Sequence, residues 1–176
     1  VPVTERQTLE AFVSGTMPRY MSIIEEVAME SGGVIADVGH SESWACRSAV
    51  NGYEISAVRF NIPLIDYEDL RRIVGDAAQR YGYSYSTDPV PRDKENMRSV
   101  GLGDQDGNSL IFDHFEDDVI FVQFSSGCLP SLRSRDIYGQ FAIPSAQEMF
   151  PRLTVVDAYD ADKQKNPLIF RHVAMD

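Results

Sequence analysis

The sequence predicts an α+β protein: an antiparallel β-sheet with N-terminal and central helices packed on one face, as a two-layer sandwich with one disulfide. Two segments with helical spacing of apolar residues come first, and a third follows the clearest strand. Short strands joined by polar turns fill much of the second half. The two cysteines, Cys46 and Cys128, each flank an extended stretch, so a bond between them is the simplest interpretation.

The N-terminal segment predicts two helices. Thr4–Gln7 has the form of a capping box, so we expect a first helix to begin near Thr4. Gly15 and Pro18 interrupt the apolar pattern, and Thr16 can cap a second helix. That helix should end near residue 31, where two glycines supply the positive φ angles of a helix end.

The clearest strand is predicted at Tyr53–Ile62, after a short apolar stretch at Val34–Val38. Its apolar residues change parity between Ala57 and Val58, so either both faces are covered or a β-bulge lies there. The next segment is the strongest helix prediction. Asp66 is a candidate N-cap, and an apolar stripe continues to residue 81, where a glycine follows.

The second half predicts an antiparallel meander. Tyr83–Ser86 has an extended pattern, and the charged run at residues 91–98 indicates a solvated connection. Further strands are expected at Met97–Leu102, Ser109–Phe115 and Val119–Phe124. Polar turns at residues 106–107 and 116–118 join them. Beyond Pro130 we expect one helical turn at residues 145–148 and a final strand at 168–173.

Length and charge limit the classes of function. The chain has 176 residues, 43% hydrophobic and 24% charged, which fits one globular domain with a substantial core. It carries 16 Lys and Arg against 27 Asp and Glu, a formal charge of −11. A surface of this sign repels nucleic acid and anionic lipid, so we expect no nucleic-acid partner. A protein partner with a basic surface suits the charge.

The chain's start and hydropathy are compatible with export. No apolar run approaches the roughly 20 residues that span a bilayer, and no charged-then-apolar leader is present. The chain begins with Val1 instead of Met, so we expect either a processed form or a chain from which a leading segment was removed. We therefore predict a single extracytoplasmic domain over residues 1–176, of which residues 131–176 form an irregular, proline-containing extension.

The cysteine pair carries the prediction of cellular location. A Cys46–Cys128 disulfide would close a loop of about 80 residues, stabilise the protein by on the order of 4 kcal/mol and imply an oxidising compartment. Two independent buried thiols would give the same composition. A nucleophilic cysteine is less favoured, because neither has a His or a basic cluster nearby in the sequence.

Candidate chemistry is sparse. Asp104–Asn108 resembles the opening of a calcium loop, but Gly and the acidic ligand are not where an EF-hand needs them, so a hairpin turn is preferred. Asp113 and His114 are metal-ligand types whose side chains should point to opposite faces of a strand. We predict no metal, no cofactor and no catalytic residue.

Aromatic residues supply weak candidates for ligand binding. Tyr83 and Tyr85 could line an aromatic groove, although a half-exposed sheet face explains them as well. Trp44 should share a strand face with Cys46, where packing on the disulfide is the simpler role.

Taken together, these segments resemble the LppA-type lipoproteins of actinobacteria over roughly residues 4–130. The motifs that carry the resemblance are Trp44 before Cys46, Asp66 to Leu70, Ala78 to Gly82, Gly101 to Gly103, and the strand that runs into Gly127 and Cys128. In those proteins an exported domain follows a lipid-modified cysteine. The resemblance therefore implies a membrane-anchored location in the native form, with membrane contact only through an anchor absent from this chain. It implies no particular activity.

The leading hypothesis is a non-catalytic domain of the cell envelope that binds a protein or another ligand. One alternative is an envelope hydrolase whose groups meet only in space, for example a carboxylate pair beside His114. Another is an immunity-like protein that inhibits a secreted toxin, which shares the acidic surface.

Overall fold

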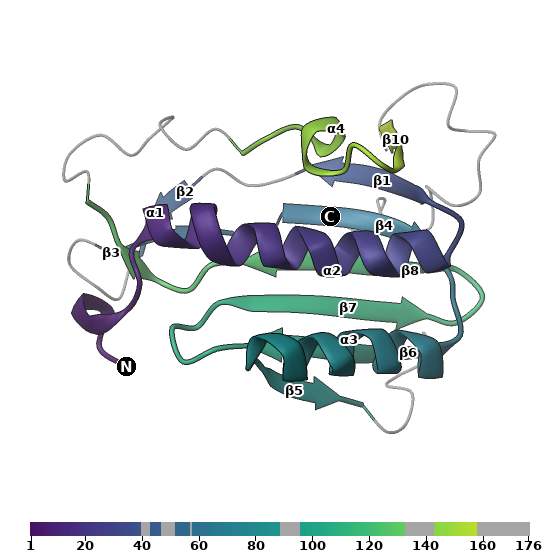
Figure 1. The fold of residues 1–176 in the computed structure, drawn as a ribbon, viewed down its shortest axis with the longest axis horizontal. Coiled ribbons are helices and arrows are strands. Elements are labelled where there is room, and N and C mark those ends of the chain that lie inside the picture. The colour runs from purple at the N-terminus through teal and green to yellow at the C-terminus, as the bar shows by residue number, and fades with distance from the viewer. Residues whose placement is uncertain (40–42, 47–51, 57, 89–95, 133–142, 158–176) are drawn as a thin grey trace.

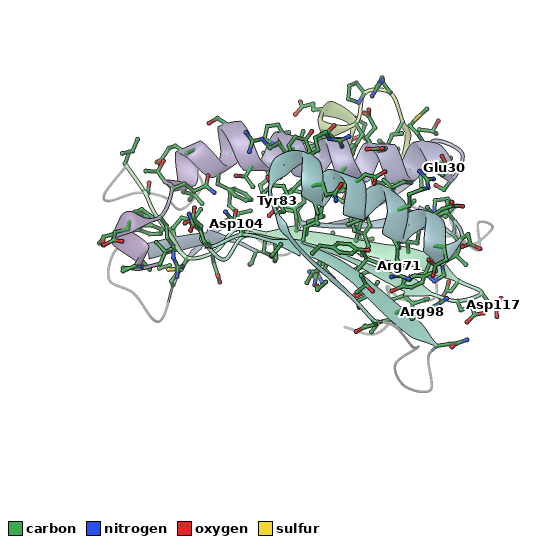
Figure 2. The ribbon with its side chains drawn as sticks, turned by 60° about the horizontal axis from the view of Figure 1, so that its bottom comes forward. Glu30, Arg71, Tyr83, Arg98, Asp104 and Asp117 are labelled. Carbon is green, nitrogen blue, oxygen red and sulfur yellow. A yellow bond between two sulfur atoms is a disulfide. The ribbon has the colours of Figure 1, made fainter. Side chains whose placement is uncertain are left out.

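The computed structural model describes residues 1–39, 43–46, 52–56, 58–88, 96–132 and 143–157. Two long helices cover one face of a seven-stranded sheet, as Figures 1 and 2 show from two directions. Among the helices in these ranges, none is long and apolar enough to cross a membrane. The predicted α+β architecture is confirmed. In chain order the elements are η1 (Val3–Glu5), α1 (Leu9–Ala11), η2 (Phe12–Thr16), α2 (Met17–Glu30), β1 (Val34–Gly39), β2 (Ser43–Ala45), β3 (Gly52–Ile55), β4 (Val58–Pro63), α3 (Tyr67–Tyr81), β5 (Ser84–Thr87), β6 (Met97–Gly103), β7 (Ser109–Phe115), β8 (Val119–Ser125), β9 (Leu129–Pro130), α4 (Ala146–Met149) and β10 (Thr154–Asp157).

The large sheet has the strand order β10-β1-β4-β8-β7-β6-β5. Its strand pairs are antiparallel except for β1 and β10, which run parallel. The meander from β5 to β8 follows the prediction closely, with Gly107 and Asp117 at positive φ in the two turns. The β10 strand was not predicted, and the strand expected at residues 168–173 lies outside the described residues.

The predicted strand at Tyr53–Ile62 is two strands. Its first part, β3, belongs to a small sheet of order β2-β3-β9, whereas its second part, β4, pairs with β8 and β1 in the large sheet. The change of apolar parity near Val58 therefore marks the passage from one sheet to the other. The bulge considered at Ala57 falls outside the described residues. Within β4, the consecutive residues Phe60, Asn61 and Ile62 are all buried, so both faces of this strand are covered there, as the other alternative proposed.

The first N-terminal helix begins later than predicted and continues into the second, which spans Met17–Glu30 close to its predicted bounds. The capping residue is Thr8, whose Oγ1 accepts a hydrogen bond from the Ala11 amide at 3.2 Å, while Thr4 lies in a short 3-10 turn. The predicted interruption at residues 15–18 is absorbed by the π-helical turn η2, in which the Met17 amide donates to the Phe12 carbonyl. This wider turn comes directly before Pro18, whose ring nitrogen has no proton to donate.

The core lies between the helices and the sheet. The α2 side chains Tyr20, Ile23, Ile24 and Val27 are fully buried, and so are Leu70, Val74 and Ala77 of α3. The predicted ends of α3 are confirmed: Asp66 Oδ1 accepts from the Glu68 amide at 2.8 Å, and Gly82 has a left-handed φ of 71°. The helical turn expected at residues 145–148 is present as α4, with a capping box between Ser145 and Glu148, and Phe150 after α4 meets Phe60 edge to face.

Candidate functional site

A shallow groove runs along α3 beside the edge strand β5. Three adjoining hollows of about 620, 580 and 300 Å³ form it. The first and second share Gly82 and Tyr83, and the second and third share Gly75, Asp76 and Tyr85. We call this surface the α3–β5 groove. Its further lining residues are Tyr81, Ser84, Gly103, Asp104, Gln105 and Asp106 at one end, Ala78 and Gln79 in the middle, and Glu68, Arg71 and Arg72 at the other end.

Tyr83 and Tyr85 both line the groove, and they also belong to a partly exposed face of the sheet, so both sequence-based alternatives fit them. Residues two apart on a strand face the same side, and here that side is the one that α3 covers. Tyr83 is half-buried, with its ring centroid 5.6 Å from Tyr20 and 6.0 Å from Tyr81. Tyr85 is 39% exposed, and its hydroxyl donates to the Arg71 carbonyl at 3.2 Å.

Gly75 on α3 makes room for the Tyr85 ring. A Cβ at residue 75 would lie 3.6 Å from the Tyr85 Cζ atom, an ordinary contact, so any longer side chain would reach into the groove. A glycine in the middle of a helix costs about 1 kcal/mol relative to alanine. The groove is therefore open at its centre at some expense to the intrinsic stability of α3.

The charges in the groove differ in how they are paired. Arg71 and Arg72 lie 3.0 and 3.4 Å from Glu68 and Asp69 on their own helix. Asp76 is exposed and makes no ion pair or hydrogen bond with any residue in the described ranges. Asp104 lies beside Tyr83 at one end, as Figure 2 shows. The uncompensated charge in the middle of the groove is thus negative.

The tyrosines at this end stay protonated at neutral pH. Burial raises the pKa of Tyr83, the nearby Arg19 guanidinium opposes this, and Asp104 adds to it. Burial raises the pKa of Tyr20 further, again with a contribution from Asp104. The groove therefore offers aromatic ring faces and carboxylate acceptors. Such a set binds a partner by stacking, hydrogen bonding and attraction of positive charge.

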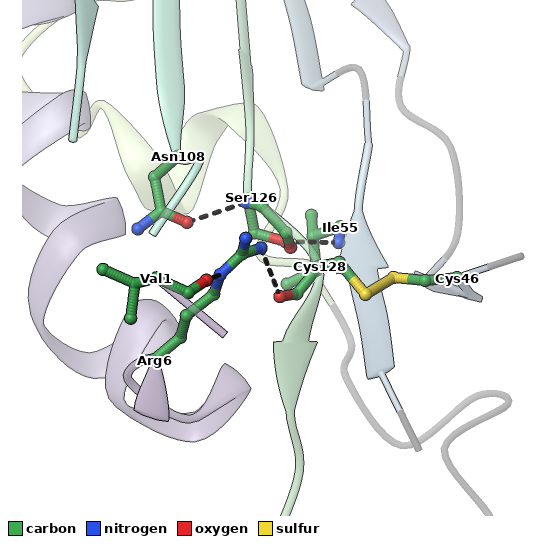
Figure 3. Close-up of a disulfide and its surroundings, with 8 residues drawn as sticks. Val1, Arg6, Cys46, Ile55, Asn108, Ser126 and Cys128 are labelled. Atoms are coloured by element: carbon green, nitrogen blue, oxygen red, sulfur yellow. Dashed lines mark hydrogen bonds between the residues drawn. A yellow bond between two sulfur atoms is a disulfide. The ribbon is translucent and has the colours of Figure 1, made fainter. Parts of the chain in front are cut away.

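The disulfide lies in a hydrogen-bonded junction next to the acidic end of the groove. Cys46 and Cys128 are joined, as predicted, with Cα atoms 6.0 Å apart across 82 residues. Arg6 Nη1 donates to the Cys128 carbonyl at 3.1 Å, which ties the N-terminal segment to the bond (Figure 3).

Asn108 connects this junction to the groove. The buried Asn108 Oδ1 accepts from the Gly127 amide at 2.8 Å, and its Nδ2 donates to Asp104 Oδ2 at 2.8 Å. A Cβ on Gly127 would collide with the Asp106 carbonyl oxygen, so only glycine fits there. The turn that supplies Asp104 and Asp106 to the groove is therefore held against the segment that carries Cys128.

The same contacts settle the interpretation of residues 104–108. The predicted hairpin turn is confirmed, because Asp104 Oδ1 accepts from the amides of Asp106 and Asn108 at 2.9 and 3.1 Å. Within the described ranges, no three His, Cys, Asp or Glu side chains are grouped so that they could hold a metal ion.

Asp113 and His114 point to opposite faces of β7, as predicted. Asp113 Oδ1 accepts from Ser99 Oγ at 2.6 Å. His114 is 5% exposed, its Nε2 lies 2.9 Å from the Ile65 carbonyl oxygen, and its ring meets Tyr67 edge to face. His114 is thus part of the core and is not an accessible base.

Trp44 belongs to a different sheet from Tyr85. It lies on β2 in the small sheet, whereas Tyr85 lies on β5 at the edge of the large one. Sequence reasoning missed Gly75 and Asp76, since their role depends on α3 lying beside β5. It also missed Asn108, although the Asp-x-Asp-Gly-Asn turn is a signal of side-chain capping.

Comparison with known proteins gives a family without an assigned activity. Residues 5–137 match the family described as Domain of unknown function (DUF4853). The chain is also similar to the crystal structure, at 2.65 Å resolution, of a DUF4853 family protein from Actinomyces odontolyticus ATCC 17982. That similarity has a TM-score of 0.71 and 28% sequence identity and covers 86% of this chain and 85% of the other. No curated protein matches. The comparisons do not confirm the resemblance to LppA-type lipoproteins; the family match spans most of the sequence, and this chain belongs to the DUF4853 family.

Proposed function

We propose that this chain is a non-catalytic binding domain that works outside the cytoplasm and takes its partner in the α3–β5 groove. The observation that carries the proposal is the groove itself. It combines the rings of Tyr83 and Tyr85 on the strand side with an opening at Gly75 of α3 and the Asp76 carboxylate, which has no partner among the described residues. These features favour recognition of a partner.

The location rests on the disulfide. A Cys46–Cys128 bond is compatible with an oxidising compartment, where such bonds form and persist. Attachment to the cell envelope as a lipoprotein rests on the resemblance alone. Its test is to label the product of the complete natural gene with an alkyne-tagged fatty acid in an actinobacterial host. Incorporation would support the anchor, and an unlabelled protein in the aqueous phase would contradict it.

In the hydrolase alternative, His114 was the proposed base, and its position does not suit that role. His114 is buried and bonded to a backbone carbonyl, and Asp113 lies on the opposite face of the sheet. A general base must come within hydrogen-bond reach of the proton that it removes. This burial supports binding over hydrolysis as the function of the domain.

The experiment compares capture from envelope extracts by the oxidised wild type and two variants. Gly75→Gln fills the centre of the groove with a residue that favours helix. Met29→Gln changes a residue of α2 that is 53% exposed and lies outside the groove. We expect the wild type and Met29→Gln to retain the same protein or small molecule in native mass spectra, and Gly75→Gln to lose it. Equal capture by all three, or by none, would contradict the proposal.

A further inference from the structure

We infer that the α3–β5 groove binds an extended, basic peptide segment, which adds as a strand to the free edge of β5. The inference rests on the proposed function and names the kind of partner that it takes. Three features carry it: the open backbone of β5, the hollows between this strand and α3, and the unpaired negative charge along them.

The outer edge of β5 has backbone groups without a partner strand. The Asp88 amide donates to the Ser99 carbonyl at 3.0 Å, and the register pairs Ser86 with Gly101 and Ser84 with Gly103. In an antiparallel pair, alternate residues direct their amide and carbonyl toward the neighbouring strand. Tyr85 and Thr87 therefore direct theirs away from β6, on a side where the described part of the chain places no strand.

The residues of β5 are also not of the types that usually protect an edge strand. Natural edge strands are protected by lysine, proline or a covering element. The sequence of β5 is Ser-Tyr-Ser-Thr, and its first three residues are exposed. This short strand offers two amide donors and two carbonyl acceptors, which match the backbone spacing of one added strand.

The hollows would receive alternate side chains of that strand. A strand added to β5 lies about 4.8 Å from it, and every second side chain points to the face that α3 covers. On that face are the second and third hollows, lined by Gly75, Asp76 and Tyr85. Tyr85 thus supplies a ring face for the stem of a side chain, and Asp76 supplies an acceptor for its end.

The charge of the groove favours Lys or Arg in the partner. Asp76 is unpaired within the described ranges, whereas Arg71 and Arg72 are neutralised by neighbours on the same helix. Asp104 and Asp106 continue the negative charge at the far end. A second copy of this chain fits poorly, because each copy carries a formal charge of −11.

The experiment titrates the ¹⁵N-labelled, oxidised chain with a hexapeptide of alternating valine and lysine, capped at both ends. We expect saturable shifts of the Tyr85 and Thr87 amides and at least tenfold slower hydrogen exchange at these two. The Ser84 and Ser86 amides, already bonded to β6, should change little. Asp76→Asn should weaken binding about two- to five-fold, as expected for a partly exposed ion pair.

Two controls separate strand addition from other binding. Thr87→Pro removes one outward amide and should weaken binding about tenfold, whereas Thr87→Val keeps the amide and should not. A second control leaves the protein unchanged and methylates alternate backbone nitrogens of the peptide. This peptide cannot donate the hydrogen bonds of an added strand and should not bind.

Several results would overturn the inference. These are shifts confined to another surface, equal affinity for the methylated peptide or for an alternating valine–glutamate peptide, no saturation at millimolar peptide, or dimerisation through β5 in light scattering. If the peptide fails while Gly75→Gln still abolishes capture from extracts, strand addition is wrong and the binding function stands.

Discussion

Two buried residues hold the disulfide junction together. Gly127 lies so close to the Asp106 carbonyl that no side chain fits between them, and Asn108 joins the Gly127 amide to the Asp104 carboxylate. Both residues act through backbone and amide groups, which apolar periodicity does not reveal. Their substitution should change stability far more than their size suggests.

Gly127→Ala should lower the free energy of unfolding by about 2–3 kcal/mol, since the new methyl group forces the 104–108 turn away from Cys128. The matched control is Gly15→Ala, because nothing lies within 4 Å of the position of its Cβ in the helical segment. The control should be neutral or stabilising by up to about 1 kcal/mol. Urea unfolding measures both, and equal stability of the two variants would contradict this account of Gly127.

Asn108→Asp should lower stability in a pH-dependent way. The new carboxylate keeps the bond from the Gly127 amide but faces Asp104 Oδ2, where the wild-type amide donates at 2.8 Å. A buried carboxylate at position 108 this close to the partly buried Asp104 carboxylate raises the pKa of one of the two. We expect a loss of about 2–3 kcal/mol at pH 7 that shrinks toward about pH 5 as the pair takes up a proton. A loss that does not depend on pH would contradict the pairing.

At the scale of elements, capping residues, turn residues and apolar periodicity predicted those helices and hairpins whose ends depend on neighbouring residues. The caps of α3 are Asp66 and Gly82, directly at its ends, and the turns of the meander β5–β8 are set by residues within the turns. The continuous Tyr53–Ile62 strand and the break at Gly15 were wrong. The division of that strand between two sheets depends on which strands pair with it, and the π turn before Pro18 keeps the helix continuous where an interruption was expected. The parallel strand β10 pairs across more than 100 residues and has no local signal.

The same reasoning applies to the candidate site. The alternating Tyr83 and Tyr85 were visible in the sequence, since the period of a strand is two. Gly75 and Asp76 gain their meaning only from the position of α3 above β5. A glycine within a strong amphipathic helix was the one available signal, because it needs a packing or functional reason.

The α2 helix places a tyrosine hydroxyl in the core, and this predicts an alkaline response. Burial raises the pKa of Tyr20, Tyr67 and Tyr83. Above about pH 10 the unfolded chain loses these protons while the folded state keeps them, so the free energy of unfolding falls as pH rises.

Tyr20→Phe should remove part of that fall. The Tyr20 hydroxyl is buried and has no hydrogen-bond partner among the described residues, so the variant should be within about 1 kcal/mol of the wild type at pH 7. Urea unfolding at pH 7 and between about pH 10 and 11 measures the difference. An unchanged alkaline slope would show that Tyr20 ionises freely in the folded state.

For the whole molecule, the disulfide and the groove are linked through the 104–108 turn. The bond closes 82 residues, and the chain-entropy relation gives about 4 kcal/mol for a loop of this length. A Cys46→Ser, Cys128→Ser double variant should lose roughly this stability in urea unfolding. Amide exchange in residues 104–108 should rise before that in α3. Uniform acceleration across both regions would contradict the link.

The central claim is that the α3–β5 groove is the binding surface, and site-directed photo-crosslinking tests it most directly. A benzoylphenylalanine is placed at Gln79, which lines the groove, or at Met29, which is exposed on α2 away from it. Each protein is then irradiated in the native envelope. The account predicts one discrete cross-linked partner from position 79 and none of that partner from position 29. The same partner from both positions, or from position 29 alone, would contradict it.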